Sequence, residues 1–448
     1  MSGNGTIFAL SSGRGRAGVA VIRISGPRAG EAARALTGAP PPSPRHAVLR
    51  TLRDPTERDL PLDRALLLFF AAPASFTGED VLELHIHGGR AVIDGVIAAL
   101  ARLPGLRPAA PGEFTRRAFE NGKLDLTAAE GLGDLIGAET EAQRRQALRQ
   151  MSGALGALYE GWRERLLSAL AAIEAEIDFP DEEVPEAAVT KVAPGIARVR
   201  DEIAAHLDDA HRGERLRDGV SIVILGPPNV GKSSLLNALA NREAAIVAAG
   251  AGTTRDVIEL AFDLGGYPAS LIDTAGLRAA DDAVEAEGVR RALERGATAD
   301  IRLLVIEAAT WPRIPEELAG HGGEGAVIVA NKVDLVGTME AGALDAEGGA
   351  FAVSAKTGAG LDALLGHLEA RVVALCDVGA APAITRARHR QALEACHAAL
   401  AAFFAEGEDV ELAAEAVRLA TRELGRLTGR VDVEDVLDRL FADFCIGK

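Results

Sequence analysis

The fold of this chain is decided by the stretch Ser221-Ile222-Val223-Ile224-Leu225-Gly226-Pro227-Pro228-Asn229-Val230-Gly231-Lys232-Ser233-Ser234. The pattern is typical of a strand, a glycine-bounded loop and the start of a helix, and the spacing G-x-x-x-x-G-K-S is that of a phosphate-binding P-loop. Gly226 and Gly231 let the backbone turn its N–H groups toward a polyphosphate, and the helix N-terminus adds partial positive charge. Lys232 supplies a cation for the β- and γ-phosphates, and the Ser233 hydroxyl is a ligand for Mg²⁺. The stretch predicts a nucleotide-binding α/β domain, with a chance glycine turn as the weaker alternative.

Composition and charge narrow the class of protein. The chain has 448 residues, enough for about two to four domains, and 48% of them are hydrophobic, as in a folded protein. The net charge of −17 argues against a broad basic face that wraps duplex nucleic acid, although a local basic patch stays open. No apolar run is long enough to span a membrane, and the start of the chain lacks a signal pattern. Three cysteines, Cys376, Cys396 and Cys445, are too few for a disulfide framework, so we expect a cytoplasmic protein without membrane attachment.

Strand and helix signals divide the chain into α/β and helical parts. The first part alternates, with strands expected at 6–10, 19–25, 66–70 and 81–86 and helices at 28–36 and 91–103. Residues 127–211 are mainly helical, interrupted at Phe179–Pro185 by an acidic stretch that we interpret as a solvated turn rather than a cation or partner site. Residues 218–376 alternate again, and helices return at 386–406, 410–427 and 433–444. Because each helical part alone has too little core, we expect a nucleotide domain inserted into one helical domain.

Four further motifs follow the P-loop in the order expected of a GTP-binding domain. Gly252–Asp256 would bring Thr254 to Mg²⁺ and the γ-phosphate, and Asp273–Gly276 follows a strand signal. In Asn331–Asp334, the Asp carboxylate accepts two hydrogen bonds that guanine offers and adenine does not. Ser354–Lys356 closes over the base. The predicted GTP-binding residues are Asn229, Val230, Gly231, Lys232, Ser233, Ser234, Thr253, Thr254, Asp273, Thr274, Ala275, Gly276, Asn331, Lys332, Asp334, Ser354, Ala355 and Lys356.

Leu277 departs from the small signalling GTPases, which carry a water-orienting Gln at this position. Another group must therefore orient the water that attacks GTP, and another positive charge must stabilise the transition state.

The chain resembles the MnmE (TrmE) family of tRNA-modification GTPases over essentially its whole length. The motifs that carry the resemblance are G-x-P-N-x-G-K-S-S-L-L-N-A-L at Gly226–Leu239, A-G-T-T-R-D at Ala251–Asp256, D-T-A-G-L-R at Asp273–Arg278, C-I-G-K at Cys445–Lys448, and the N-terminal pieces at 13–26 and 75–89. The resemblance implies a fold class of multidomain α/β plus all-α. It implies an N-terminal α/β folate-binding and dimerisation domain (1–120), a helical domain in two parts (121–217 and 379–448), and an inserted Ras-like, doubly wound P-loop GTPase domain (218–378).

The resemblance also implies how GTP hydrolysis is assisted. In this family the GTPase domains pair face to face and K⁺ takes the place of an arginine finger. The positions that match its K⁺ site are Asn229, Ala248, Gly250 and Thr253, and those that match its Mg²⁺ site are Ser233 and Thr254. Glu285 matches the catalytic glutamate that orients water, whereas from the residues alone it is an ordinary surface acid. Cys445 matches a cysteine used in the modification reaction, and prenylation of that cysteine is disfavoured by the residues after it.

A second ligand site is implied in the first part of the chain. Arg23, Glu83 and Lys123 match the residues that bind 5-formyl- or 5,10-methylene-tetrahydrofolate in the family. A guanidinium and an ammonium suit the glutamyl carboxylates of such a carrier, and a carboxylate suits the N–H edge of its pterin. Without the resemblance, Arg23 is better explained as a solvent-facing charge on an edge strand. His85 and His87 share one strand face but lack an evident third ligand, so we expect a structural role rather than metal binding.

The function implied is GTP-driven, K⁺-dependent modification of the wobble uridine (U34) of tRNA at C5 with an aminomethyl or carboxymethylaminomethyl group. The implied partners are a second copy of the chain and an MnmG (GidA) type protein that uses FAD and NADH, in a heterotetramer or larger complex. Two rivals stay open: a GTP-switch ribosome-assembly factor without modification chemistry, and a folate enzyme with a regulatory GTPase domain.

Overall fold

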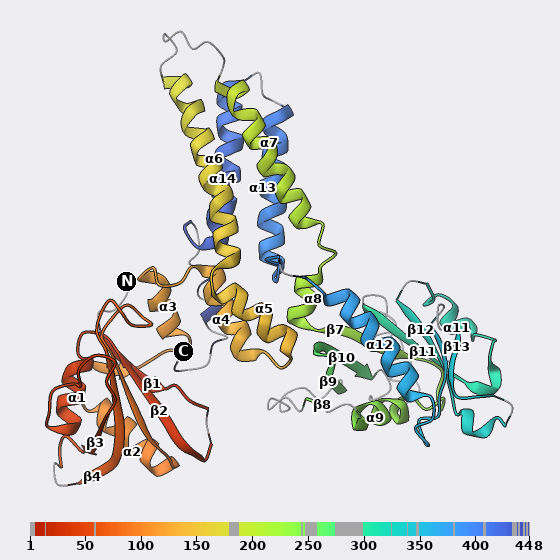
Figure 1. The fold of residues 1–448 in the computed structure, drawn as a ribbon, viewed down its shortest axis with the longest axis horizontal. Helices are drawn as coiled ribbons and strands as arrows, with labels where there is room; N and C mark the ends of the chain where they lie inside the picture. Colours follow the sequence, from red (N-terminus) through yellow and green to blue (C-terminus); the bar gives the residue numbers. More distant parts are fainter. Residues whose placement is uncertain are drawn as a thin grey trace, which may run out of the picture. The chain divides into compact units, whose positions relative to one another are not determined.

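The protein is described here by a computed structural model, drawn in Figure 1. It describes residues 5–13, 15–57, 60–178, 188–242, 245–246, 258–273, 299–323, 325–337, 339–345, 349–379, 381–405 and 409–431, and the single residues Leu437, Leu440, Phe441, Phe444 and Gly447. The chain forms two compact units: residues 1–133, 150–164 and 421–448 make the first, and residues 134–149 and 165–420 make the second. The division into four domains stays a prediction.

The first unit contains a six-stranded sheet in the order β3-β4-β5-β2-β1-β6. Its strands are β1 (Thr6–Leu10), β2 (Ala17–Ser25), β3 (Val48–Arg53), β4 (Pro61–Phe70), β5 (Val81–Gly88) and β6 (Leu106–Pro108). All neighbours pair antiparallel except β1 and β6. Helices α1 (Ala29–Thr37) and α2 (Arg90–Ala101) bury apolar side chains such as Leu36 and Leu100 against one face, where Ile22 and Leu84 point. The alternation of strand side chains leaves Arg23 and Glu83 on the opposite face.

A smaller apolar cluster covers part of that opposite face. Helix α3 (Glu113–Glu120) places Phe114 against Ile7 and Ala9 of β1. Beyond α3, the chain continues into α4 (Leu126–Gly137), α5 (Glu141–Met151) and the long helix α6 (Ala154–Asp178). Leu126 of α4 packs with Leu437 and Phe441 from near the C-terminus, so the end of the chain returns to the first unit.

Helices of the second unit run side by side in Figure 1. They are α7 (Ala188–Leu207), α13 (Ala387–Ala405) and α14 (Val410–Thr428), together with the later turns of α6. Helix α13 packs against α7, and Arg418 of α14 forms an ion pair of 2.9 Å with Glu174 of α6. The short helix α8 (Arg212–Asp218) leads into the nucleotide-binding sheet, and Asp134 joins its Arg217 to Arg386 through N–O distances of 3.2 and 2.7 Å.

The second sheet has eight strands in the order β13-β14-β12-β11-β7-β10-β9-β8. Its strands are β7 (Val220–Leu225), β8 (Ala245–Ile246), β9 (Ile258–Leu264), β10 (Tyr267–Asp273), β11 (Ile301–Glu307), β12 (Ala326–Asn331), β13 (Gly342–Asp345) and β14 (Ala350–Ala352). Its helices are α9 (Lys232–Arg242), α11 (Glu316–Ala319) and α12 (Leu361–Cys376), with the short turns η1 (Ala308–Thr310) and η2 (Val333–Leu335). Strands β10, β7, β11, β12 and β14 are parallel, and buried residues form a core on each face.

Most expected elements are confirmed with shifted ends. The strand expected at 6–10 matches β1, and the helices expected at 386–406 and 410–427 match α13 and α14. Strands β3 and β6 were not expected, because Arg50 and Arg53 break the apolar alternation of β3 and β6 has three residues. The interruption at Phe179–Pro185 and most of the helix expected at 433–444 lie outside the described residues. Among the described residues, no helix is long and apolar enough to cross a membrane.

Candidate functional site

The P-loop connects β7 to α9, as its sequence predicts. Asn229 has a positive φ of 64°, and Gly231 has a φ of 97°. A Cβ atom on Gly231 would lie 2.4 Å from Asn331 Nδ2, and one on Gly226 would lie 2.3 Å from the Val305 carbonyl oxygen. Gly226 is therefore required by the close Val305 backbone, and Gly231 by the close Asn331 side chain together with its positive φ.

Within this loop, the Lys232 ammonium folds back onto the chain. Its Nζ donates to the carbonyl oxygens of Gly226 and Pro227, at 2.8 Å each. These bonds hold the ammonium inside the curve of the loop, where an incoming phosphate would meet it. Ser233 and Ser234, at the start of α9, are exposed.

The guanine-type motifs meet the P-loop through Asn331. Its Nδ2 donates to the Val230 carbonyl oxygen at 2.9 Å, and its Oδ1 accepts from the Ala355 N–H at 3.0 Å. Ser354 Oγ donates to Asp334 Oδ1 at 2.6 Å, which orients a carboxylate whose residue is exposed. Three motifs that are far apart in sequence therefore form one connected site.

Lys332 lies in the same site and has an acidic partner that sequence reasoning missed. Its φ is 67°, and its Nζ is 2.5 Å from Oε1 of Glu307, the last residue of β11. Glu307 belongs to none of the motifs, and its place at the carboxyl end of a parallel strand was the available signal. Lys356, also predicted, is exposed and follows Ala355 in the segment that Asn331 contacts.

The remaining predicted residues of the nucleotide site are Asp273 and a group outside the described residues. Asp273 ends β10 and is the backbone register partner of Ile224 on β7, so it lies beside the strand that leads into the P-loop. The residues that lie outside the described part of the chain are Ala248, Gly250, Thr253, Thr254, Thr274, Ala275, Gly276, Leu277, Glu285 and Cys445.

On the first sheet, Arg23 and Glu83 are register partners on β2 and β5. Arg23 Nε and Nη2 donate to Glu83 Oε1 at 3.0 and 2.9 Å. The guanidinium carbon lies 5.5 Å from the centre of the Phe76 ring and 5.9 Å from that of Phe114. Because β2 lies between β5 and β1, and the Arg23 side chain is only 22% exposed, the solvent-facing edge-strand interpretation is wrong.

The loop 75–80 links this pair to the region of Lys123. Phe76 stands over Arg23, and a Cβ on Gly78 would meet Lys123 Cε at 3.4 Å. Asn121 Nδ2 fastens the loop by donating to the Thr77 carbonyl oxygen at 2.6 Å. The structure thus brings Arg23 and Glu83 into contact and places Lys123 against the same loop, with no direct bond between Lys123 and the pair among the described residues.

A buried ion cluster supports that loop. Arg117 Nη1 donates to both Glu79 oxygens at 3.1 and 3.0 Å, and its Nη2 donates to Glu113 Oε1 at 2.9 Å. Burial raises the pKa of Glu113, but hydrogen bonds from Arg107, the Ala110 N–H and Arg117 outweigh it and lower that pKa to about 2. Glu113 therefore stays ionised at neutral pH, and the hydrogen bonds of Arg117 to Glu113 and Glu79 keep α3 attached to the loop.

The two histidines on β5 contact carboxylates of the protein, and two of the three cysteines are buried. His85 Nε2 lies 3.3 Å from Glu83 Oε2, and His87 Nδ1 lies 2.7 Å from Asp63 Oδ1. Within the described ranges, no group of three or more His, Cys, Asp or Glu side chains is arranged to hold a metal ion. Cys376 and Cys396 are buried as predicted, and burial raises the pKa of Cys376 to about 12.

Comparisons with known proteins cover both units. Two family models match: "GTP-binding protein TrmE N-terminus" over residues 6–123 and "MnmE helical domain" over residues 126–445. The tRNA modification GTPase MnmE of Parvibaculum lavamentivorans is 58% identical over 446 residues, covering 99% of this chain and 100% of the relative. That of Rhodospirillum rubrum is 55% identical over 453 residues, covering 99% of each chain. The solved G domain of the T. maritima FeoB iron transporter is 25% identical, covers 35% of this chain and 99% of that chain, and has a TM-score of 0.25.

Proposed function

The chain belongs to the MnmE family of tRNA modification GTPases, and from that membership we propose a K⁺- and Mg²⁺-dependent enzyme that modifies the wobble uridine of tRNA at C5. It is a GTP hydrolase that takes part in tRNA modification. We further propose that it acts in the cytoplasm with a tetrahydrofolate as one-carbon donor and with an FAD- and NADH-using MnmG (GidA) type partner. The observation that carries the proposal is the 58% identity to a tRNA modification GTPase over 99% of the chain. It is combined with two chemically different candidate sites, the one around Asn331 and the Arg23–Glu83 pair.

The nucleotide site has residues that suit GTP and Mg²⁺. Lys232, already held inside the loop, would bind phosphate oxygens. Asp334, oriented by Ser354, would accept the guanine N1–H and 2-amino hydrogens. The Ser233 hydroxyl and the proposed Thr254 hydroxyl are oxygen ligands, which Mg²⁺ prefers. Bound Mg²⁺ would neutralise phosphate charge.

For K⁺, the chain offers Asn229 at the tip of the loop, with Ala248, Gly250 and Thr253 proposed as further ligands. The positive φ of Asn229 turns its backbone away from the helical path of α9. An amide oxygen and backbone carbonyl oxygens suit a monovalent cation, which would supply the charge that other GTPases obtain from an arginine. Glu285 is proposed to orient the attacking water in place of the Gln that Leu277 replaces.

The folate proposal draws support from the first sheet. Among the described residues, Nη1 of the Arg23 guanidinium has no hydrogen-bond partner and is left for a ligand acceptor, and the Phe76 and Phe114 rings beside it offer surfaces for a flat heterocycle. Glu83 is 15% exposed, so one face of the pair is accessible. Lys123 would bind a glutamyl carboxylate from the other end of loop 75–80. Cys445, near the end of the chain, is proposed to act in the modification chemistry.

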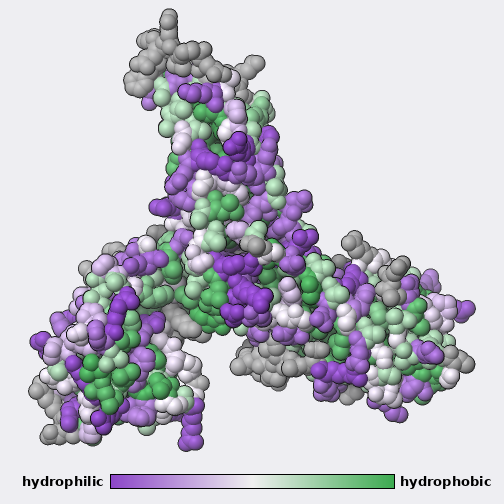
Figure 2. Space-filling view, viewed as in Figure 1, coloured by the Kyte–Doolittle hydropathy of each residue, from purple (hydrophilic) through white to green (hydrophobic). Residues whose placement is uncertain are grey.

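Homodimerisation through the first sheet is supported by its exposed apolar residues. Val19, Leu49 and Leu66 are 56%, 52% and 39% exposed. Leu66 is the register partner of both Leu49 and His85, so these residues share the face that carries Glu83. Figure 2 shows hydrophobic residues gathered on the visible face of this sheet. A second copy that covered this face would remove the apolar area from water.

Profiling of modified nucleosides in tRNA tests the proposal. In cells that lack the gene, we expect the wobble uridine to lack its C5 group, and the wild-type gene should restore it. The Cys445→Ser chain should fail to restore it while hydrolysing GTP within about twofold of the wild-type rate, because Cys445 belongs to none of the nucleotide motifs. Intact wobble modification together with a ribosome-assembly defect would instead establish the assembly-factor rival.

The cation dependence is a separate expectation. At equal ionic strength, GTP hydrolysis should be faster in KCl than in NaCl by about 10³-fold, the effect of an arginine finger in related chemistry. The Asn229→Ala chain should lose most of this preference, because one K⁺ ligand is gone. Single-turnover phosphate release measures both rates. Equal rates in the two salts would contradict the proposed role of K⁺.

A further inference from the structure

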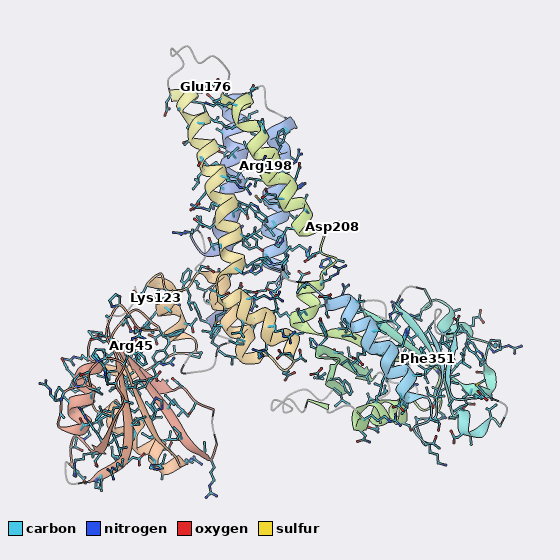
Figure 3. The ribbon with its side chains drawn as sticks, viewed as in Figure 1. Arg45, Lys123, Glu176, Arg198, Asp208 and Phe351 are labelled. Atoms are coloured by element: carbon cyan, nitrogen blue, oxygen red, sulfur yellow. The ribbon has the colours of Figure 1, made fainter. Side chains whose placement is uncertain are left out.

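A cavity of about 600 Å³ opens in the first unit beside Lys123. Three separate segments build its wall: the turn after α3, the first turns of α6, and the end of α14 with the residues after it. The residues that line the cavity include two cations, two acids, a threonine and the glycine before α6: Lys123, Arg430, Asp125, Glu160, Thr428 and Gly153. Figure 3 labels Lys123 in the turn that follows α3. The volume lies within the range of about 300–1,000 Å³ that is common for ligand sites.

The two acids in this wall already have partners. Asp125 Oδ1 accepts from Thr127 Oγ1 at 2.6 Å and from the Ala128 N–H at 2.8 Å, which caps α4. Glu160 Oε1 accepts from Arg163 Nη1 at 3.0 Å. Asp125 Oδ1 and Glu160 Oε1 are therefore engaged within the protein, whereas Glu160 Oε2 is buried and has no hydrogen-bond partner among the described residues.

The two cations of the wall, in contrast, remain available. Across the described ranges, the Lys123 ammonium has no hydrogen bond or ion pair, and its residue is exposed. The Arg430 side chain is 62% exposed, and the acid paired with it, Glu160, is 3.7 Å away. A ligand that carries negative charge could thus meet both cations without displacing a strong internal bond.

Two neutral features of the wall add donors. The 25-residue helix α6 starts at Ala154, directly after Gly153, so its N-terminus with its partial positive charge lies at the cavity. Thr428 is 6% exposed, and its hydroxyl has no hydrogen-bond partner among the described residues. A buried hydroxyl without a partner is costly unless a ligand or water satisfies it.

We propose that this cavity binds the anionic tail of the one-carbon carrier, so that the chain prefers tetrahydrofolates with several glutamyl residues to the monoglutamate. The inference rests on the proposed use of tetrahydrofolate and names the form of that substrate. Each added glutamyl residue brings one more carboxylate, which the cavity meets with Lys123, Arg430 and the start of α6. Binding of the carrier by Arg23 and Glu83 does not by itself require this selectivity.

Titration calorimetry on the full-length chain tests the proposal. The ligands are 5-formyltetrahydrofolate with one, three and five glutamyl residues. For each added carboxylate that pairs with an exposed cation, we expect binding to tighten by about two- to fivefold, and this preference should shrink as salt rises. Arg430→Met should remove most of the preference without changing monoglutamate affinity. Arg426→Met is the matched control, because Arg426 pairs with Glu423 on α14 and does not line the cavity.

Each other outcome overturns the inference in a distinguishable way. Equal affinity for the three ligands would exclude the tail site and leave the folate proposal standing. Absence of binding by all three would overturn the folate proposal and this inference together. If Arg430→Met weakened tRNA binding and left the chain-length effect unchanged, the cavity would be a phosphate contact for tRNA instead.

Discussion

The Asp334→Asn chain is expected to lose its affinity for GTP and to bind xanthosine triphosphate instead. In the proposed site the Asp334 carboxylate would accept from two guanine donors, N1–H and the 2-amino group, whereas an amide at this position presents one donor and one acceptor. Xanthine retains N1–H but carries a carbonyl oxygen at C2, so its edge matches the amide. A polar site of this kind rejects a mismatched ligand by about 10⁴-fold, which is the expected loss of GTP affinity. Competition between labelled GDP and xanthosine diphosphate measures the exchange.

This expectation depends on a carboxylate that is already oriented. Ser354 Oγ holds Asp334 Oδ1 at 2.6 Å, and the residue itself is exposed, so the substitution should leave folding intact. Asp201→Asn serves as the matched control, because Asp201 lies on α7 with its side chain 66% exposed. If the Asp334→Asn chain kept its preference for GTP, another group would read the guanine edge.

The second large effect is expected from Gly231→Ala. The new methyl group would lie 2.4 Å from Asn331 Nδ2, at a backbone φ of 97° that L-residues rarely adopt. Asn331 would have to move, and with it the bonds to the Val230 carbonyl and the Ala355 N–H. Because these bonds connect the phosphate loop with the segments proposed to bind the base, we expect GDP and GTP affinities to fall by up to about 100-fold, the effect of losing two hydrogen bonds.

A second glycine in the same domain provides the control. Gly366 lies within α12, has no positive φ, and a Cβ there would meet no atom within 4 Å. Gly366→Ala should therefore keep nucleotide affinity and raise helix stability by about 0.5–1 kcal/mol. Fluorescent GDP binding and thermal unfolding of both variants separate the two effects. Equal nucleotide affinity in the two variants would contradict the steric argument for Gly231.

The nucleotide site could be predicted in detail because its chemistry lies in short contiguous motifs. Lys232, Asn331, Asp334 and Ser354 were each assigned from their neighbours, and the structure brings the P-loop, the Asn331–Asp334 segment and the Ser354–Lys356 segment into contact. Glu307 escaped prediction, since an acid at the end of an apolar strand has no motif around it. The proposed Glu285 and Cys445 roles came from the family resemblance alone, because isolated residues carry too little local pattern.

In the first unit, by contrast, the tertiary structure corrected what the local sequence predicted. Local sequence favoured a solvent-facing Arg23 on an edge strand, because an arginine amid apolar residues usually faces water. Strand order decided otherwise: β2 is an interior strand, and Arg23 pairs with Glu83 of β5 beneath two aromatic rings. Strand β3 was not predicted for a related reason. Its charged residues interrupt the apolar alternation, and the strand is recognised only from its pairing with β4.

The sequence by itself determined that this protein binds GTP, because phosphate and guanine are recognised by backbone curvature and side chains within single short loops. It also determined membership in its family, through motifs spread from Gly13 to Lys448. Only the tertiary structure decided that Lys123 shares a cavity with the start of α6 and with Arg430. The physical reason is that the cavity is made by three segments far apart along the chain, and their meeting depends on packing of the whole first unit.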